Sequence, residues 1–140
     1  MAQLLDFYSD YAANTLVKPQ TFTSSNIEGS GTGTDLLGYR GAILVAETGA
    51  SGALCGESNK MTIAFVESSD NSTFTAIADT DLVGGNNTAV IDANGDANST
   101  HYRSYIGTKR YVRVEFQATA GAVSIPVAAS IVRGKPLQKR

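Results

Sequence analysis

The sequence predicts an all-β protein, a single antiparallel β-sandwich of the jelly-roll type with about eight strands. Small polar and turn-forming residues are abundant, because Thr, Ser, Gly and Asn together supply about a third of the 140 residues. The good helix formers Glu, Lys, Leu and Gln are sparse, and β-branched and aromatic residues cluster in short runs. Short strands separated by Gly-, Asn- and Ser-rich turns are typical of sandwiches and barrels. No linker divides the chain, so we expect one domain over residues 1–140.

The first third of the chain predicts an extended segment followed by one long strand. Residues 4–12 fit either a marginal helix or a strand. Residues 14–23 are expected to be extended, because Pro19 disfavours the α region for the residue before it. A loop is expected at 24–34. Residues 39–47 form an almost continuous apolar run, which favours a central strand covered on both faces.

The middle of the chain predicts a hairpin and further short strands. After a loop at 48–59, residues 60–67 alternate in character and lead through a Ser-Ser-Asp-Asn-Ser turn to residues 74–78. That short separation is typical of a β-hairpin. Residues 89–91 are expected to form a strand, and Asn94-Gly95 is a strong signal for a hairpin turn.

The last third predicts three strands and a tail. The strands are expected at 101–106, 111–119 and 123–132. Alternation is clearest in 111–119, where the even-numbered residues are apolar and the odd-numbered ones mostly polar, so we expect a half-buried strand. Residues 133–140 are basic, contain Pro136 and are expected to form a short surface tail.

The composition leaves little room for catalysis. A single cysteine, Cys55, excludes an intrachain disulfide and a multi-cysteine metal site, and a single histidine, His101, excludes a metal centre built on a His pair. No apolar run approaches the roughly 20 residues of a membrane span. The N-terminus lacks the basic region and apolar core of a signal peptide. We therefore expect no enzyme activity, no cofactor and no membrane association.

Charge is distributed unevenly along the chain. Residues 1–100 carry 3 basic and 12 acidic residues, whereas residues 101–140 carry 8 basic residues and one acid, Glu115. Such asymmetry is typical of contact with nucleic acid, an acidic partner or an acidic face of a neighbouring subunit. The alternative is that the cations protect edge strands from aggregation. Basic and aromatic residues mix between Tyr102 and Arg113, as in single-strand binders, but the net charge of −2 argues against direct nucleic-acid binding.

Two loops resemble ligand loops, and each has a simpler interpretation. The stretch Gly29-Ser30-Gly31-Thr32-Gly33-Thr34 lacks the GxGxxG register and the Gly-Lys-Ser/Thr ending of phosphate loops, so a plain loop is favoured. Residues 92–98, Asp-Ala-Asn-Gly-Asp-Ala-Asn, resemble half of a calcium loop. No glutamate follows at the closing position, so a turn is favoured there, and whether it holds a cation stays open.

Two further patterns resemble catalytic pairs. Asp79 and Asp81 could form a carboxylate pair of the kind that glycosidases use, but they adjoin a Gly-Gly sequence and favour a solvated turn. Cys55 could act as a nucleophile only with His101 as its base, and no family signature brings the two together. A small apolar role is favoured for this cysteine.

Several motifs occur in a recognisable order. The opening run Leu4-Leu5-Asp6-Phe7-Tyr8-Ser9-Asp10 precedes Asp35-Leu36-Leu37-Gly38, the turn phrase 67–74, the strand 108–116 and the small-residue turn 119–122. In this order they resemble a family of small head proteins of tailed bacteriophages, the capsid decoration or cement proteins. The resemblance spans most of the chain. The sequence departs from the family pattern at Leu37, inserted before Gly38, and at Tyr8, where Phe is usual.

The resemblance implies a jelly-roll homodimer in the virion, on the outer surface of an icosahedral head assembled in the host cytoplasm. Its partner would be the phage major capsid protein, and its role would be to clamp neighbouring capsid subunits after the head expands. Because charge is split along the chain and the two ends lack a core pattern, we expect the N-terminal segment and the basic tail to make the contacts. The candidate contact residues are Leu4, Leu5, Phe7, Tyr8, Arg133, Lys135, Lys139 and Arg140.

Two other classes of function stay open at this point. Another virion component, such as a head-completion, tail-tube or fibre-base protein, would also be rich in β-structure and poor in catalytic residues. A carbohydrate-binding β-sandwich could share the fold. The chain contains no Trp, which argues against a sugar platform, although its six Tyr residues keep that alternative open.

Overall fold

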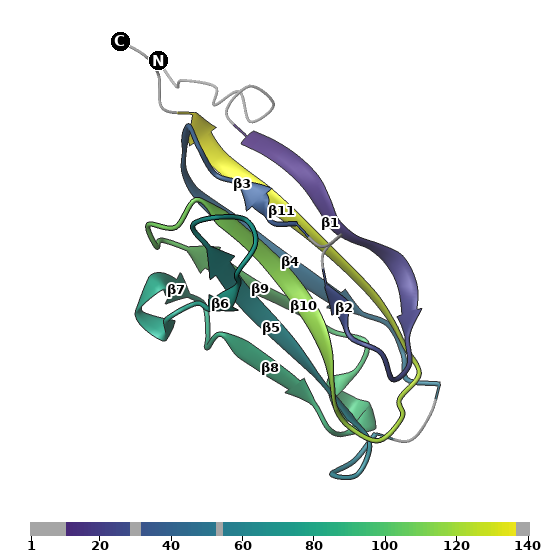
Figure 1. Ribbon diagram of the computed structural model, residues 1–140. Helices are drawn as coiled ribbons and strands as arrows, with labels where there is room; N and C mark the ends of the chain where they lie inside the picture. The colour runs from purple at the N-terminus through teal and green to yellow at the C-terminus, as the bar shows by residue number, and fades with distance from the viewer. Residues whose placement is uncertain (1–10, 29–31, 53–54, 137–140) are drawn as a thin grey trace, which may run out of the picture.

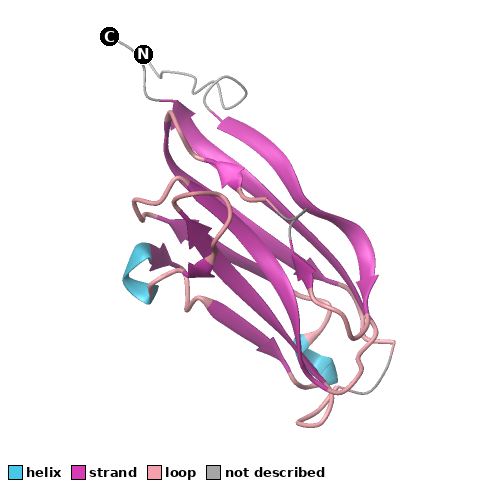
Figure 2. Cartoon of the chain, viewed as in Figure 1, coloured by secondary structure: helices cyan, strands magenta, loops and turns pink. Residues whose placement is uncertain are grey.

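The computed structural model describes residues 11–28, 32–52 and 55–136, which form two antiparallel β-sheets (Figure 1). Within these ranges the helical residues are confined to two single turns of 3-10 helix, η1 (Asp79–Asp81) and η2 (Asn94–Asp96), as Figure 2 shows. The prediction of an all-β fold is confirmed, and the two sheets are consistent with a β-sandwich.

The first sheet, called sheet A, contains the longest strands of the described chain. Its strand order is β1 (Tyr11–Phe22), β11 (Ile125–Pro136), β4 (Tyr39–Thr48), β9 (Thr100–Tyr105) and β7 (Leu82–Val83). The first and last strands of the chain therefore pair, with Tyr11 opposite Gly134 and Phe22 opposite Ile125. The register of this pair shifts on either side of Val17, so β1 bulges where the sequence predicted only an extended segment.

The second sheet, called sheet B, is built on two central strands. Its order is β2 (Ile27–Glu28), β10 (Tyr111–Ala120), β5 (Lys60–Ser68) and β6 (Thr75–Ala76). Two further short strands lie beside them: β3 (Thr34–Asp35) pairs with β10, and β8 (Thr88–Ile91) pairs with β5. The described residues thus contain eleven strand segments, and the expected number of about eight is not confirmed.

The buried apolar side chains of the described residues form one cluster between the two sheets. Each sheet contributes the alternate residues that face inward, as the two-residue period of a strand requires. Complete burial of one such side chain stabilises the fold by roughly 1.5–3 kcal/mol relative to leaving it exposed. The largest fully buried members include Phe22, Leu44, Phe65, Phe116 and Ile131.

Strand β4 differs from its prediction. It lies in the middle of sheet A, but only one of its faces is covered: Leu44 is fully buried, whereas Ile43 is 43% exposed. The continuous apolar run was therefore misinterpreted, since half of its side chains lie on the outer surface of the sandwich.

Strands β5 and β10 differ in the opposite sense, because both of their faces are buried along most of their length. On the outer side, long polar side chains of β10 lie over small residues of β5. Arg113 stands opposite Val66 and Glu115 opposite Ala64. The Arg113 guanidinium donates to Glu115 from Nε at 2.8 Å and also packs on the Phe74 ring at 3.8 Å. The half-buried prediction for residues 111–119 was wrong, because these side chains cover one another.

The hairpin after β5 is confirmed, with Val66 opposite Ala76. Its turn is organised by Asp70, whose Oδ1 accepts hydrogen bonds from the Thr73 and Ser72 amides at 2.8 and 2.9 Å and from the Ser68 hydroxyl. These donors favour the carboxylate and lower the pKa of Asp70 to about 2.

The prediction of a hairpin at Asn94-Gly95 is wrong. Strand β8 before it belongs to sheet B and strand β9 after it belongs to sheet A, so the segment crosses between the sheets. Gly95 does not have the positive φ that a two-residue hairpin would require, and the segment folds instead as η2. Burial of apolar neighbours favours this crossing conformation over a hairpin. Ile91 and Ala97 are both buried, so the two ends of the loop pack against the core.

The boundary of the basic tail also changes. The tail was expected to begin at residue 133, but β11 continues to Pro136, with Arg133 opposite Ala42 and Gly134 opposite Gly41. Residues 133–136 therefore belong to sheet A. Residues 137–140 lie outside the described residues.

The two faces of β4 give a matched test of this fold. We expect Leu44→Ala to lower the free energy of unfolding by about 2–5 kcal/mol, because it empties a fully buried site. Its neighbour Ile43→Ala should cost less than about 1 kcal/mol, because Ile43 is already half exposed. Urea unfolding of both variants measures the difference, and equal losses would contradict the one-sided burial of β4.

Candidate interaction surface

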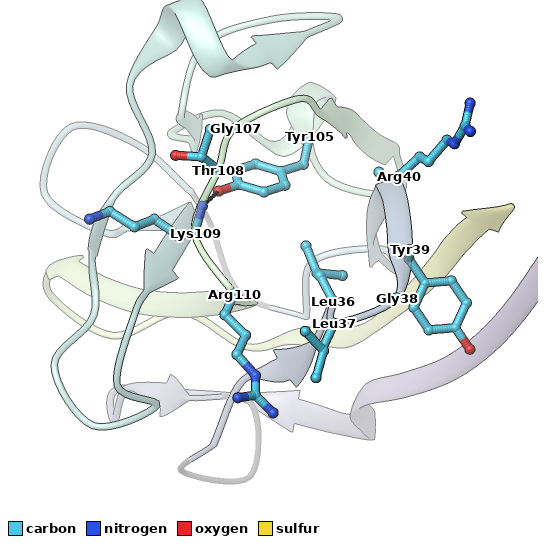
Figure 3. Close-up of a pocket in the computed structure, with 11 residues that line it drawn as sticks. Leu36, Leu37, Gly38, Tyr39, Arg40, Tyr105, Gly107, Thr108, Lys109 and Arg110 are labelled. Carbon is cyan, nitrogen blue, oxygen red and sulfur yellow. Dashed lines mark hydrogen bonds between the residues drawn. The ribbon is translucent and has the colours of Figure 1, made fainter. Parts of the chain in front are cut away.

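One end of the sandwich is hollowed into a pocket of about 350 Å³ (Figure 3). Residues 36–38, which connect β3 to β4, and the first three residues of β4 form one wall. Residues 107–110, which connect β9 to β10, form the other wall together with the ring of Tyr105. The pocket is called the basic pocket below, because its lining residues include Arg40, Lys109 and Arg110 and contain no acidic side chain.

The first wall is fixed by Asp35 and Arg110. The Arg110 guanidinium donates two hydrogen bonds to the Asp35 carboxylate, from Nε to Oδ1 at 2.9 Å and from Nη2 to Oδ2 at 2.6 Å. The same Asp35 Oδ1 accepts the Leu37 amide at 2.8 Å, while the Leu36 amide donates to the Arg110 carbonyl oxygen at 2.8 Å. Gly38 then turns the chain with a φ of +88°, a conformation that favours glycine. These bonds give a rigid loop.

This ion pair shifts the pKa values of both partners. The Arg110 side chain holds the pKa of Asp35 below its ordinary value of 3.8, and Asp35 in turn raises the pKa of Arg110. The two side chains are 41% and 46% exposed, so solvent screens the pair and its importance lies in geometry more than in stability. A bidentate pair orients the loop because both planar groups must lie together.

The second wall is fixed by the fully buried Tyr105. Its hydroxyl donates to the buried Glu67 carboxylate at 2.6 Å and accepts the Lys109 amide at 2.9 Å. Burial and the Glu67 bond raise the pKa of Tyr105 well above its ordinary value, so the phenol stays protonated and remains a donor. The ring passes directly beneath Gly107, where any Cβ would lie 2.6 Å from ring atoms. Glycine is therefore required for the loop to cross the ring.

Arg133 ties the pocket to sheet A. Its Nη1 donates to the Asp35 carbonyl oxygen at 3.1 Å, its Nη2 reaches the Asn14 side chain at 3.4 Å, and its guanidinium lies 4.5 Å from the centre of the Tyr39 ring. Its Nε is buried and has no hydrogen-bond partner among the described residues. Arg133 is thus a structural support behind the pocket wall and does not extend from a free tail.

The outer face of sheet A is the second feature of this surface. Inward residues alternate with outward ones, so every strand of the sheet places side chains on this face. Ile43, Tyr102 and Val83 are 43%, 61% and 56% exposed there. The outward set is Tyr11, Ala13, Thr15, Gly41, Ile43, Val45, Glu47, Val83, Thr100, Tyr102, Ser104, Pro126, Ala128, Ser130, Val132 and Gly134. Glu47 is the single charged residue of that set.

A row of residues at one level of this face illustrates its chemistry. Ala13, Val132, Ile43, Ser104 and Val83 lie opposite one another across all five strands. No charged side chain interrupts the row. The outer side of sheet B is different, because it carries charged side chains such as Arg113 and Glu115, which form a hydrogen-bonded ion pair. Among the described residues, the outer face of sheet A is therefore the less charged of the two outer faces.

The predicted contact residues fall into three groups. Six of them lie outside the described residues: Leu4, Leu5, Phe7, Tyr8, Lys139 and Arg140. Lys135 belongs to β11 by its backbone. Arg133 is half-buried and engaged behind the basic pocket. The sequence did not reveal the pocket itself or the sheet A face, although the unusual apolar run at 39–47 was the signal for the face.

The loops that resembled ligand sites have local structural roles. Gly33 donates its amide to Asn71 Oδ1 at 2.7 Å, which joins the glycine-rich loop to the β5–β6 turn. In the Asp92–Asn98 segment, Asn94 Oδ1 accepts the Cys55 amide at 2.8 Å. Asp79 Oδ1 accepts the Asn87 amide at 2.8 Å. Among the described residues no group of three or more His, Cys, Asp or Glu side chains is placed to hold a metal ion.

Cys55 and His101 have different neighbours. The Cys55 thiol lies 3.2 Å from the Ser51 hydroxyl, whereas His101 Nε2 lies 2.9 Å from the Ser99 hydroxyl. Burial, followed by the charge of Arg103, lowers the pKa of His101 and favours its neutral form. The described part of the chain also contains no helix of the length and apolar character needed to cross a membrane.

Comparison with known proteins adds no relative: no family model, no curated protein and no solved structure matches this chain.

The Asp35–Arg110 pair gives a pH test of the pocket wall. Because the folded-state pKa of Asp35 is lowered, its contribution to stability is present above the unfolded-state value of 3.8 and is lost as the pH falls through the lower folded-state pKa. We expect Arg110→Gln to move the Asp35 pKa up toward 3.8. Carboxyl ¹³C NMR titration measures this directly.

Arg40→Gln is the matched control, because Arg40 lines the same pocket but does not contribute to the shift of Asp35. It should leave the Asp35 titration unchanged. An Asp35 pKa that does not respond to Arg110→Gln would show that the pair does not fix this loop.

Proposed function

We propose that this chain is a structural virion protein that decorates the outer surface of an icosahedral phage head. In this role it cements neighbouring major capsid subunits and stabilises the expanded shell. The observation that supports the proposal is the outer face of sheet A, which is partly exposed and carries a single charged residue, Glu47, over five strands. A broad sheet face with few charges is suited to lie against another protein. The ordered motifs that resemble cement proteins supply the class of partner.

We propose further that the sandwich is a jelly roll. Strands β2 and β3 both pair with β10, and β6 and β8 both pair with β5, so each couple can be counted as one interrupted strand. Counted in this way, and with the short edge strand β7 set aside, the orders are 1-8-3-6 in sheet A and 2-7-4-5 in sheet B. The chain then changes sheet at almost every step, as two nested Greek keys require. This order supports the jelly-roll assignment with eight strands.

A cement role needs many modest contacts and no reaction chemistry. Copies bound around one shell act together, so weak single contacts add through multivalency. Each copy that binds only the expanded shell stabilises that state by mass action. The basic residues at the pocket end, and Lys139 and Arg140 of the tail, would meet acidic residues of the capsid protein. Homodimer formation, which the resemblance implies, would double the number of contacts that each bound unit makes with the shell.

Quantitative mass spectrometry of purified particles of the phage that encodes this chain tests the proposal. We expect hundreds of copies per particle, near a simple ratio to the major capsid protein. A dozen copies or fewer would assign the chain to the neck or tail, and absence from particles would overturn a virion role. In that last case a glycan-binding screen would test the carbohydrate-binding alternative.

A matched pair of variants tests the sheet A face in the same assay. Ile43 and Val90 are both strand residues and are 43% and 45% exposed, but Val90 lies in β8 of sheet B. We expect Ile43→Glu to reduce particle occupancy at least roughly tenfold, because an unpaired charge would be buried against the shell. Val90→Glu should bind normally, and equal occupancy of the two variants would remove the sheet A face from the contact. Thermal unfolding checks that both variants fold.

A further inference from the structure

We propose that Glu47, on the outer face of sheet A, pairs with a lysine or arginine side chain of the major capsid protein. The inference rests on the proposed function, because it takes this face as the contact with the shell. It adds the chemistry of the partner surface, which carries a cation opposite Glu47 and uncharged side chains around that cation.

Glu47 is the single charged residue of the outward set. It lies near the end of β4, opposite Ala128 of β11 and Thr100 of β9, and Val45 is the preceding outward residue of its own strand. The Glu47 side chain is exposed. No described residue forms a salt bridge with its carboxylate. Water therefore solvates this charge in the free subunit.

Docking of the sheet A face would remove that water. A carboxylate that a partner covers loses much of its hydration, and this loss is costly unless a cation or hydrogen-bond donors replace the water. The neighbours of Glu47 cannot replace it, because Ala128 and Val45 have no polar side-chain group and Thr100 has only a neutral hydroxyl. The covering surface must therefore supply the compensating charge.

Two hollows meet at Glu47 and leave room for a long side chain. They lie over β1, β11 and β4, which are neighbours in sheet A (Figure 1). One measures about 500 Å³ and the other about 150 Å³, and Pro19, Glu47 and Ala128 line both. A cavity of about 150 Å³ holds a six-membered ring, so either hollow can accept the end of a lysine or arginine side chain. The other lining residues are uncharged, so Glu47 determines the sign of the group that fits.

A second copy of this chain does not supply the cation through the same face. The outward set of sheet A contains no Lys, Arg or His, so two copies packed face to face would cover both Glu47 carboxylates without pairing them within that set. Several cations of the chain are already engaged within their own subunit: Arg103, Arg110, Arg113 and Arg133. We therefore assign the cation to the capsid protein.

The position of Glu47 also orients the subunit on the shell. Arg40, near the start of β4, belongs to the basic pocket, whereas Glu47 lies seven residues further along the same strand, about 23 Å away for an extended chain. The two ends of the contact therefore carry opposite charges. Such separation favours one orientation of the docked subunit, because the reversed orientation would bring like charges together.

Dissociation from expanded heads that lack this chain tests the proposal. Labelled full-length chain is bound to such heads, and its release is followed in an excess of unlabelled chain. We expect Glu47→Gln to raise the dissociation rate at least roughly tenfold, because the covered cation would lose its partner. Glu47→Asp keeps the charge and should dissociate more slowly than Glu47→Gln. The matched control Glu57→Gln removes the same charge from an exposed turn before β5 of sheet B and should dissociate like the unchanged chain.

The other outcomes separate this inference from the proposed function. Equal dissociation rates for Glu47→Gln and Glu57→Gln would overturn the charge pair, and the sheet A face would remain the contact if Ile43→Glu still reduced occupancy. A change confined to the association rate would indicate long-range steering and would also overturn the pair. Sedimentation that shows self-association of the unchanged chain but not of Glu47→Gln would assign the cation to a second copy. If the unchanged chain does not bind the heads, the proposed function fails and this inference fails with it.

Discussion

The pairing of the first strand with the last is the interaction on which the rest of the sandwich depends. Strand β1 forms one edge of sheet A and pairs along its length with β11, which in turn pairs with β4 in the middle of the sheet. Without β11, neither β1 nor the inward-facing Phe22 and Leu16 would be held against the core. Among the strand pairs of the described residues, this one joins the residues that lie farthest apart in the sequence, so it is costly in entropy and slow to form.

The strand pairings also bring acidic and basic residues together in space. The β1–β11 pairing brings the start of β1 and the end of β11 to the same end of the sandwich, and the Asp35–Arg110 and Tyr105–Glu67 contacts hold the two loops that frame the pocket there. The separation of acidic and basic residues along the sequence is therefore not a separation in space. The basic C-terminal third and the acidic N-terminal part interleave strand by strand, as Arg110 with Asp35 and Arg113 with Glu28 illustrate.

Local patterns predicted most strands well but not their surroundings. The alternation at 111–119, the run at 39–47 and the turn at 68–72 all gave strands or hairpins near their expected positions. What failed was the environment of those strands: an apolar run does not reveal that Ile43 faces outward, and an arginine in a strand does not reveal that Phe74 covers it. Asn94-Gly95 failed for the same reason, because burial of Ile91 and Ala97 in the core outweighed the turn propensity. The pocket could not be predicted from the sequence, because its walls come from loops that only the sheet pairing brings together.

The described residues begin and end at the same pole, because Tyr11 pairs with Gly134, and this has a practical consequence for anyone who handles this protein. A peptide fused directly before Tyr11 or directly after Pro136 would start beside the basic pocket and the edge of sheet A, where it can compete with whatever those surfaces bind. The opposite pole offers a cleaner attachment point. There Gly56 and Asn59 close a tight turn through reciprocal amide-to-carbonyl bonds, and Glu57 and Ser58 at its tip are exposed. Cargo inserted at that tip would project away from the pocket and leave both termini native.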